Sequence, residues 1–274
     1  FDGRVIDWFD GQISTSEGQS YALLRAVWIG DRGTFDTVLN WTLNNLHKTD
    51  NHLFAWKWGK RTDGSWGIIE NVSATDGDEN IALALAIAYS KWGDIRYREL
   101  AINIIKDIWA YETILIKDER YLTAGDWVKM ENNTVSINPS YLAPYIYRVF
   151  ASIDSSHNWL EIVDTSYDII HRCSESSKAY LPPDWCMFNR NGEVVLPDIS
   201  NKKNDTSYDA FRTYWHLAFD YVWFGEKRAY KYIKSSSPLL AAHWIKKGKF
   251  ADSYAKDGSP RSDNEALSIY GMLL

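Results

Sequence analysis

The chain has 274 residues, of which 45% are hydrophobic, and a formal net charge of −6. It can bury a sizeable core, while its acidic balance offers no basic surface to a nucleic-acid backbone. No apolar run approaches the roughly 20 residues that span a bilayer. We therefore expect no nucleic-acid partner, no membrane span in this chain and a monomer. The chain starts at Phe1 without a secretory signal, which leaves the compartment unknown; a secreted, periplasmic or cell-surface location is suspected, with any leader or anchor absent from this sequence.

Apolar residues recur at helical spacing in ten segments. The expected helices lie at about 17–29, 34–47, 78–92, 95–112, 139–152, 157–171, 207–222, 226–235, 238–247 and 264–273. Tight turns join them in pairs, which is the pattern of antiparallel helical hairpins. Long segments rich in aromatic residues separate the pairs, and loops of this length within a compact domain usually carry function.

The helices that open the pairs begin at a regular interval of roughly 60 to 70 residues, near Glu17, Asp78, Ser140 and Tyr208. If the hairpins stack in order, the long loops gather at one face, together with the acidic residues near these helix starts, Glu17, Asp76, Asp78 and Asp209. The pattern predicts an all-α fold, an (α/α)6 barrel in a single domain over residues 1–274. Six hairpins require two more helices than the pattern provides. Residues 53–58 and 66–69 are expected to form a small β-hairpin on the cleft face.

The first predicted helix opens with Ser16-Glu17-Gly18-Gln19. Ser16 is expected to cap it, and Gln19 to complete a capping box. Glu17 lies in the first turn, where the helix dipole favours a carboxylate. The alternative to a functional role is that Glu17 only complements this dipole.

Large aromatic residues are numerous, with 14 Trp and 17 Tyr. Trp58, Trp66 and Trp127 lie outside the helical patterns. Flat rings in loops suit a sugar-binding cleft, because they stack on the apolar faces of pyranose rings; the alternative is that they anchor long loops to the body. Cys173 and Cys186 lie in one loop-rich region, where a disulfide and two free thiols are both open.

Three acidic segments follow one another along the chain, Ser16–Tyr21, Ala74–Leu85 and Ser207–Thr213. Together they resemble the motifs of glycoside hydrolase family 8, and Ala74–Leu85, closed by Trp92, is similar to the signature of that family. The run Asn138-Pro139-Ser140-Tyr141 also resembles the family. The resemblance extends over nearly the whole chain.

The resemblance implies an (α/α)6 barrel and an inverting endo-glycosidase. It implies Glu17 as general acid, Asp209 as general base, and Asp76 as a carboxylate that binds the sugar at the cleaved bond. The substrate-binding residues expected beside them are Trp58, Trp66, Trp127, Tyr141, Tyr208, Arg212 and Asp78. The chain is most similar to members associated with exopolysaccharide production, so the expected substrate is a β-linked bacterial polysaccharide of that kind.

The chemistry can also be argued from the residues. Hydrolysis with inversion needs an acid on the leaving oxygen and a base behind a water, with the carboxyl groups about 6.5 to 9.5 Å apart. Arg212 lies three residues after Asp209 on the same helical face, where its charge favours an ionised base. Each acidic residue also has a structural alternative. Asp76 or Asp78 could cap the third helix, and Asp209 with Arg212 could form a surface ion pair of little effect.

The six histidines show no ligand spacing, and no phosphate loop or nucleophile elbow occurs, so neither a metal nor a cofactor is expected. Two other functions stay open. One is a β-1,4-glucanase of general type, and the other is a non-catalytic polysaccharide-binding module on the same scaffold.

Overall fold

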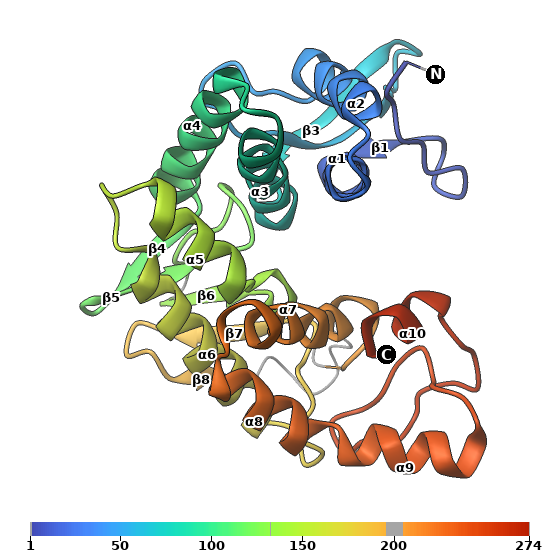
Figure 1. Cartoon of the computed structure of the whole chain (residues 1–274). Helices are drawn as coiled ribbons and strands as arrows, with labels where there is room; N and C mark the ends of the chain where they lie inside the picture. The colour runs from blue at the N-terminus through green and yellow to red at the C-terminus, as the bar shows by residue number, and fades with distance from the viewer. Residues whose placement is uncertain (1, 132, 196–204, 274) are drawn as a thin grey trace. The chain divides into compact units, whose positions relative to one another are not determined.

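Figure 1 shows a computed structural model of the chain, which describes residues 2–131, 133–195 and 205–273. The described residues form ten α-helices, one short 3₁₀ helix and eight short strands. The ten helices lie within a few residues of the predicted ranges, except that the fifth begins later. The chain divides into two compact units, and each is described by itself. A single domain over residues 1–274 stays a prediction.

The first unit comprises the chain up to Thr113 together with Ala124–Trp127 and Val149–His157. It holds two helical hairpins, α1 (Ser16–Ile29) with α2 (Arg32–Asn45) and α3 (Thr75–Trp92) with α4 (Ile95–Tyr111). Helix α1 packs against α2 and α3, and α3 packs against α4. The first turn of α3 is buried as completely as its middle, because Thr75–Asn80 are all inside the unit.

A small antiparallel sheet accompanies these helices, with strand order β1 (Ser14–Thr15), β2 (Ala55–Lys60) and β3 (Trp66–Ser73). Strands β2 and β3 pair Lys60 with Trp66, so the predicted hairpin is confirmed. Gly64 occupies its turn with a φ of +86°, a conformation that L side chains rarely adopt. Strand β1 runs directly into α1, which ties the start of that helix to the hairpin.

One device makes the tight turns between paired helices. A glycine with positive φ ends the first helix, and the acidic residue that follows caps the second by accepting a hydrogen bond from a backbone N–H. The three instances are Gly30-Asp31 and Gly93-Asp94 in the first unit and Gly225-Glu226 in the second. These turns confirm three of the helical hairpins that the sequence predicts.

The second unit comprises Ile114–Thr123, Val128–Arg148 and the chain from Asn158. Its helices are α6 (Trp159–Glu175), α7 (Tyr208–Phe224), α8 (Lys227–Ser236), α9 (Pro238–Lys247) and α10 (Leu267–Leu273). Helix α5 (Pro144–Ile153) leaves this unit after Arg148. The predicted start of the fifth helix is instead a 3₁₀ turn, Pro139–Tyr141, because Pro144 cannot continue an earlier helix through its missing N–H.

Short strands fill the long segments of the second unit. Most of β4 (Thr113–Ile116) pairs with β5 (Glu119–Leu122), and a second sheet has the order β6 (Thr134–Ile137), β7 (Cys186–Asn189) and β8 (Val194–Val195). A disulfide joins Cys173 near the end of α6 to Cys186 at the start of β7, with 6.0 Å between their Cα atoms. Of the two alternatives that the sequence allows, a disulfide or two free thiols, the structure shows the disulfide. Among the described residues, no helix is long and apolar enough to cross a membrane.

Candidate active site

Glu17 lies in the first turn of α1, as predicted. The prediction that Ser16 caps this helix is wrong. Thr15 is the N-cap, and its Oγ1 accepts a hydrogen bond of 3.0 Å from the N–H of Gly18. Gln19 makes no capping box, because its buried side chain binds elsewhere. Its Oε1 accepts from the N–H of Val5 at 2.6 Å, and its Nε2 donates to Thr42 at 2.9 Å. Gln19 thus fastens the entry segment and α2 beneath the turn that carries Glu17.

The Glu17 side chain is half-buried, and its Oε1 accepts a hydrogen bond of 3.1 Å from the hydroxyl of Tyr21, one turn along α1. A carboxyl at this position reaches solvent and accepts a hydrogen bond from a neutral donor. Access to solvent is a property that a proton donor to a bound substrate requires.

The start of α3 lies against the start of α1 through Gly77. A Cβ atom at residue 77 would lie 2.5 Å from Ser16 Oγ and 3.1 Å from the backbone nitrogen of Glu17. Only a glycine allows this approach. Its neighbour Asp76 is 4% exposed and accepts a hydrogen bond of 2.9 Å from the N–H of Gly77. The structure therefore brings the backbones that carry Glu17 and Asp76 into contact.

Asp78 lies on the far side of the same turn and has no exposed surface. Its Oδ1 accepts a hydrogen bond of 2.9 Å from the N–H of Phe54. Neither Asp76 nor Asp78 is the N-cap of α3, because that position is occupied by Ala74, which makes no side-chain capping hydrogen bond. The structural alternative offered by the sequence is therefore wrong, and Asp78 instead joins α3 to the segment before β2.

Asp78 shares its buried environment with a second carboxyl, that of Glu112. Burial raises the pKa of both, that of Glu112 to about 7. Asp78 Oδ2 and Glu112 Oε2 are buried and receive no hydrogen bond from an N–H or hydroxyl donor. A protonated Asp78 that donates to Glu112 pairs the two carboxyls and removes one buried charge, because the hydrogen bond between them raises the pKa of Asp78 and lowers that of Glu112. Ser73 completes the site by donating to Glu112 Oε1 at 2.6 Å.

The segment that carries Trp127 is fixed to this network. The Asp126 N–H donates to Ser73 Oγ at 2.9 Å, and Asp126 Oδ1 accepts from the Ser73 N–H at 2.9 Å. Lys48, only 5% exposed, forms an ion pair with the same carboxylate. The indole of Trp127 is 46% exposed above this anchor, so its position is set by buried polar contacts in the first unit.

Trp58 and Trp66 stack on each other across the β2–β3 hairpin, with ring centroids 5.4 Å apart. The guanidinium of Arg4 lies 4.4 Å from the Trp58 ring and 5.0 Å from the Trp66 ring. Trp41 adds an edge contact to Trp58. The environment of Trp58 matches the alternative in which a tryptophan anchors a loop, whereas Trp66 keeps 44% of its surface exposed.

The second unit holds Asp209 in the first turn of α7. Its Oδ1 accepts a hydrogen bond of 3.1 Å from Arg212, which confirms the predicted contact along one helical face. Its Oδ2 accepts from Asn138 Nδ2 at 3.3 Å. The Asp209 side chain is 43% exposed, while that of Arg212 is only 6% exposed. This is not a surface ion pair, because the cation is part of the core and only the carboxylate faces solvent.

The run Asn138–Tyr141 forms a cradle around Arg212. Asn138 Oδ1 accepts from the Ser140 N–H and hydroxyl, at 3.0 and 2.8 Å, and Ser140 Oγ accepts from Arg212 at 3.1 Å. The Tyr141 ring lies 5.3 Å from the guanidinium carbon. Asn138 and Tyr141, which belong to the motif that resembles the family, therefore lie beside Asp209.

The start of α7 is held by a residue that the sequence analysis did not identify. Asp184 accepts hydrogen bonds from the N–H groups of Ser207 and Ala210, at 2.9 and 3.0 Å, and from the Ser207 hydroxyl. Burial raises the pKa of Asp184 to about 6. Tyr208, predicted to bind substrate, is 52% exposed at the first position of the helix. No local signal marks Asp184, because it lies 23 residues before Ser207.

The predicted residues thus form two sets. Glu17, Asp76 and Trp127 belong to the first unit, and Asp209, Arg212 and Tyr141 belong to the second. The expectation that both sets line one cleft stays a prediction.

Comparison with known proteins identifies relatives of this chain. Residues 1–250 match the sequence profile described as glycosyl hydrolases family 8. Endoglucanase C of Ruminiclostridium cellulolyticum is 32% identical over 262 residues, which are 93% of this chain and 53% of the relative. An endoglucanase of Escherichia coli K12 is 33% identical over 217 residues, 78% of this chain and 57% of the relative. The chain spans about half the length of the curated relatives it matches.

Solved structures share the fold of this chain. An endo-1,4-D-glucanase from Vibrio fischeri ES114 has a TM-score of 0.89 at 27% identity, covering 100% of this chain and 78% of that one. Endoglucanase Cel10 from Klebsiella pneumoniae, titled a family 8 glycosyl hydrolase, has a TM-score of 0.84 at 24% identity, covering 100% and 85%. The second likeness shows the fold alone. Together with the ten helices, these likenesses confirm the predicted fold class.

Proposed function

The chain belongs to glycosyl hydrolase family 8, and we propose that it acts as an inverting endo-glycosidase on a β-linked polysaccharide. The observation that carries this proposal is the placement of Glu17. Its side chain is half-buried, and its carboxyl accepts a hydrogen bond of 3.1 Å from the Tyr21 hydroxyl. Its backbone nitrogen lies against Gly77. A helix-capping carboxylate needs none of these features.

In the proposed reaction Glu17 is the general acid and donates its proton to the glycosidic oxygen as the bond to the anomeric carbon breaks. Asp76 binds the sugar at the cleaved bond. Its burial favours this role, because a carboxylate shielded from water forms stronger hydrogen bonds to the sugar hydroxyls that reach it.

Asp209 is proposed as the general base, which removes a proton from water as that water attacks the anomeric carbon. Arg212 supports this role, because a buried guanidinium at 3.1 Å stabilises the ionised carboxylate. Asn138 holds the second oxygen of the carboxylate, so the base keeps one orientation. Asp78 is proposed to position α3 rather than to touch the sugar, because it has no exposed surface.

The roles of the two carboxyls can be tested separately. Glu17→Gln and Asp209→Asn should each lower kcat on a cleaved polymer by about 10²- to 10⁴-fold while leaving the fold unchanged. Glu99→Gln and Asp118→Asn are matched controls at exposed positions and should retain full activity. Undiminished cleavage by Glu17→Gln would refute the assignment of the acid. NMR of the first product should show the inverted anomer, and a retained one would refute the role of Asp209.

The relatives are named endoglucanases, which supports a β-linked glucan as the polymer. We propose a glucan of bacterial exopolysaccharide, such as a biofilm matrix; a β-1,4-glucanase of general type is the alternative. A panel of purified exopolysaccharides and soluble cellulose derivatives separates them, with Glu17→Gln as the blank. Binding without release of reducing ends on every polymer would favour a non-catalytic polysaccharide-binding module.

A further inference from the structure

A pocket of about 450 Å³ opens in the second unit between α6 and α8. It contains none of the residues proposed for catalysis. Its wall combines three tyrosines with charged side chains and is lined by Asp164, Tyr167, Asp168, His171, Tyr180, Arg228, Lys231, Tyr232 and Ser235. Its volume is within the ~300 to 1,000 Å³ typical of small-molecule sites.

Three tyrosines line the pocket, and the hydroxyl of each is bound to the protein. The Tyr167 hydroxyl donates to Asp220 at 2.6 Å, that of Tyr232 bonds to Ser174 at 2.6 Å, and that of Tyr180 bonds to His171. Tyr167 and Tyr232 are buried, and Tyr180 is half-buried over Tyr232 with ring centroids 5.5 Å apart. The tyrosines therefore contribute aromatic surface to the pocket, while their hydroxyl groups bond to the protein.

Tyr180 is held in an unfavourable backbone conformation. Its φ is +56°, a region that a bulky L residue rarely occupies. Such strain persists only where the surroundings enforce it, and it is concentrated at ligand sites. Here the strained backbone places the Tyr180 ring at the wall of the pocket.

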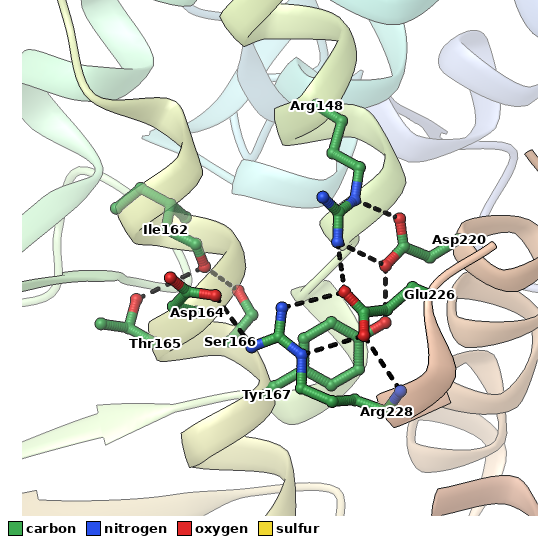
Figure 2. A network of polar contacts seen from close by, with 9 residues as sticks. All are labelled: Arg148, Ile162, Asp164, Thr165, Ser166, Tyr167, Asp220, Glu226 and Arg228. Carbon is green, nitrogen blue, oxygen red and sulfur yellow. Dashed lines mark hydrogen bonds and ion pairs between the residues drawn. The ribbon is translucent and has the colours of Figure 1, made fainter. Parts of the chain in front are cut away.

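A network of ion pairs and hydrogen bonds holds Asp164, Tyr167 and Arg228, three residues that line the pocket (Figure 2). Arg228 bonds to Asp164 at 2.8 Å and to Glu226 at 2.9 Å, and its guanidinium carbon lies 4.4 Å from the Tyr167 ring. Arg148 continues the network, to Glu226 at 2.6 Å and to Asp220 at 2.8 Å. Hydrogen bonding to Arg228 lowers the pKa of Glu226 to about 2, so Glu226 is ionised at neutral pH. The pocket is thus preformed.

The charges around the pocket are balanced. Asp164 and Asp168 oppose Arg228 and Lys231, so neither a strongly anionic nor a strongly cationic ligand is favoured. Carboxylate and cationic groups at the edge of aromatic surface can bind vicinal hydroxyls, while the rings contact the apolar face of a pyranose. A neutral saccharide matches both features.

We propose that this pocket is a second saccharide-binding site, which binds a neutral stretch of the polysaccharide through residues other than those proposed to cleave it. The proposal rests on the proposed function only for the identity of the ligand. Such a site would raise the residence of the polymer on the enzyme without contributing to bond cleavage, so its loss should affect long substrates and spare short ones.

The test uses affinity electrophoresis of the Glu17→Gln chain in gels containing hydroxyethylcellulose, a neutral polymer. Tyr180→Ala removes part of the wall, and Ser235→Trp fills the pocket from an exposed position without removing any core group. Tyr230→Ala, on the same helix but outside this pocket and 51% exposed, is the matched control. Thermal unfolding checks that each variant is folded.

We expect both pocket variants to weaken retardation by the polymer about tenfold, which corresponds to about 1.4 kcal/mol, and the control to behave as the parent. When the pocket variants are made in the chain that keeps Glu17, hydrolysis of the polymer should fall while hydrolysis of cellohexaose is unchanged. Parent-like retardation of both folded variants, or no retardation of the parent, would overturn the site. If no glycan is cleaved but the pocket variants still lose binding, the proposed hydrolysis fails and the saccharide site stands.

Discussion

Gly77 lies against Ser16, so that a Cβ atom on residue 77 would be 2.5 Å from Ser16 Oγ. This contact joins the first turns of α1 and α3 and places the backbone of Glu17 beside that of Asp76. The space of one methyl group therefore decides the separation of two carboxyls proposed to act on the same sugar.

Gly77→Ala should lower kcat by at least tenfold and destabilise the chain by roughly 1–3 kcal/mol, because the helix starts must move apart. Ser16→Gly removes the two closest atoms, so the double variant should recover part of both losses. A double-mutant cycle in urea unfolding and in kcat measures the coupling. Gly271→Ala is the control, because nothing lies within 4 Å of that position in α10. Equal effects of Gly77→Ala with and without Ser16→Gly would contradict the contact.

The buried pair of Asp78 and Glu112 predicts a pH dependence of stability. The pKa of Glu112 is about 7 in the folded chain, against an ordinary value of 4.5. Between these values the folded state keeps a proton that the unfolded state loses. The stabilisation is therefore complete below about pH 4.5 and is lost as the pH rises towards 7, at up to ~1.4 kcal/mol per pH unit.

Glu112→Gln should remove this part of the pH dependence, because the amide is neutral at every pH and can donate to Asp78. Urea unfolding at several values between pH 4.5 and 8 measures the change, with Glu99→Gln as an exposed control. A profile of Glu112→Gln that keeps the wild-type slope between pH 4.5 and 7 would show that protonation of Glu112 does not cause this pH dependence.

The contact between Arg212 and Asp209 predicts that kcat depends on the shape of the Arg212 side chain as well as on its charge. Arg212→Lys keeps the charge but replaces the planar guanidinium, whose Nη2 donates to both Asp209 and Ser140, with an ammonium on a flexible chain. We expect kcat to fall by about 10- to 100-fold with little change in KM, on the order of 1.4–2.8 kcal/mol of transition-state stabilisation. Arg96→Lys, whose side chain is 73% exposed, should leave the kinetics unchanged. A rise in KM alone would assign Arg212 to substrate binding instead.

The disulfide between Cys173 and Cys186 closes a short loop, with a sequence separation of 13. Replacing both cysteines by serine should lower the free energy of unfolding by about 3 kcal/mol, since the unfolded chain regains the freedom of that loop. Dithiothreitol should destabilise the wild type to the same extent. It should have no effect on the double variant, and an effect there would point to a different cause.

Much of this protein can be predicted from the sequence because the responsible forces are local. Helical spacing of apolar residues locates the helices, and a glycine followed by an acidic residue marks three of the tight turns. The contact between Asp209 and Arg212 follows from their separation along one helix. The motifs around Glu17, Asp76 and Asp209 place the chain in its family.

Other features depend on residues that meet only after folding. Thr15 caps α1 because β1 pairs with β2 and sets the backbone there, which leaves Gln19 to bind Val5 and Thr42. Asp184 reaches the start of α7 from another segment, and Asp78 shares its buried site with Glu112.

Short-range spacing thus determines which elements form, because each depends on neighbours within a turn or two. Tertiary structure decides what each polar group does, because burial and partners from distant segments set its charge, its hydrogen bonds and its access to solvent. The tyrosine pocket between α6 and α8 belongs to this second class. Its wall joins residues from two helices and a strained segment, and no spacing along the chain relates them.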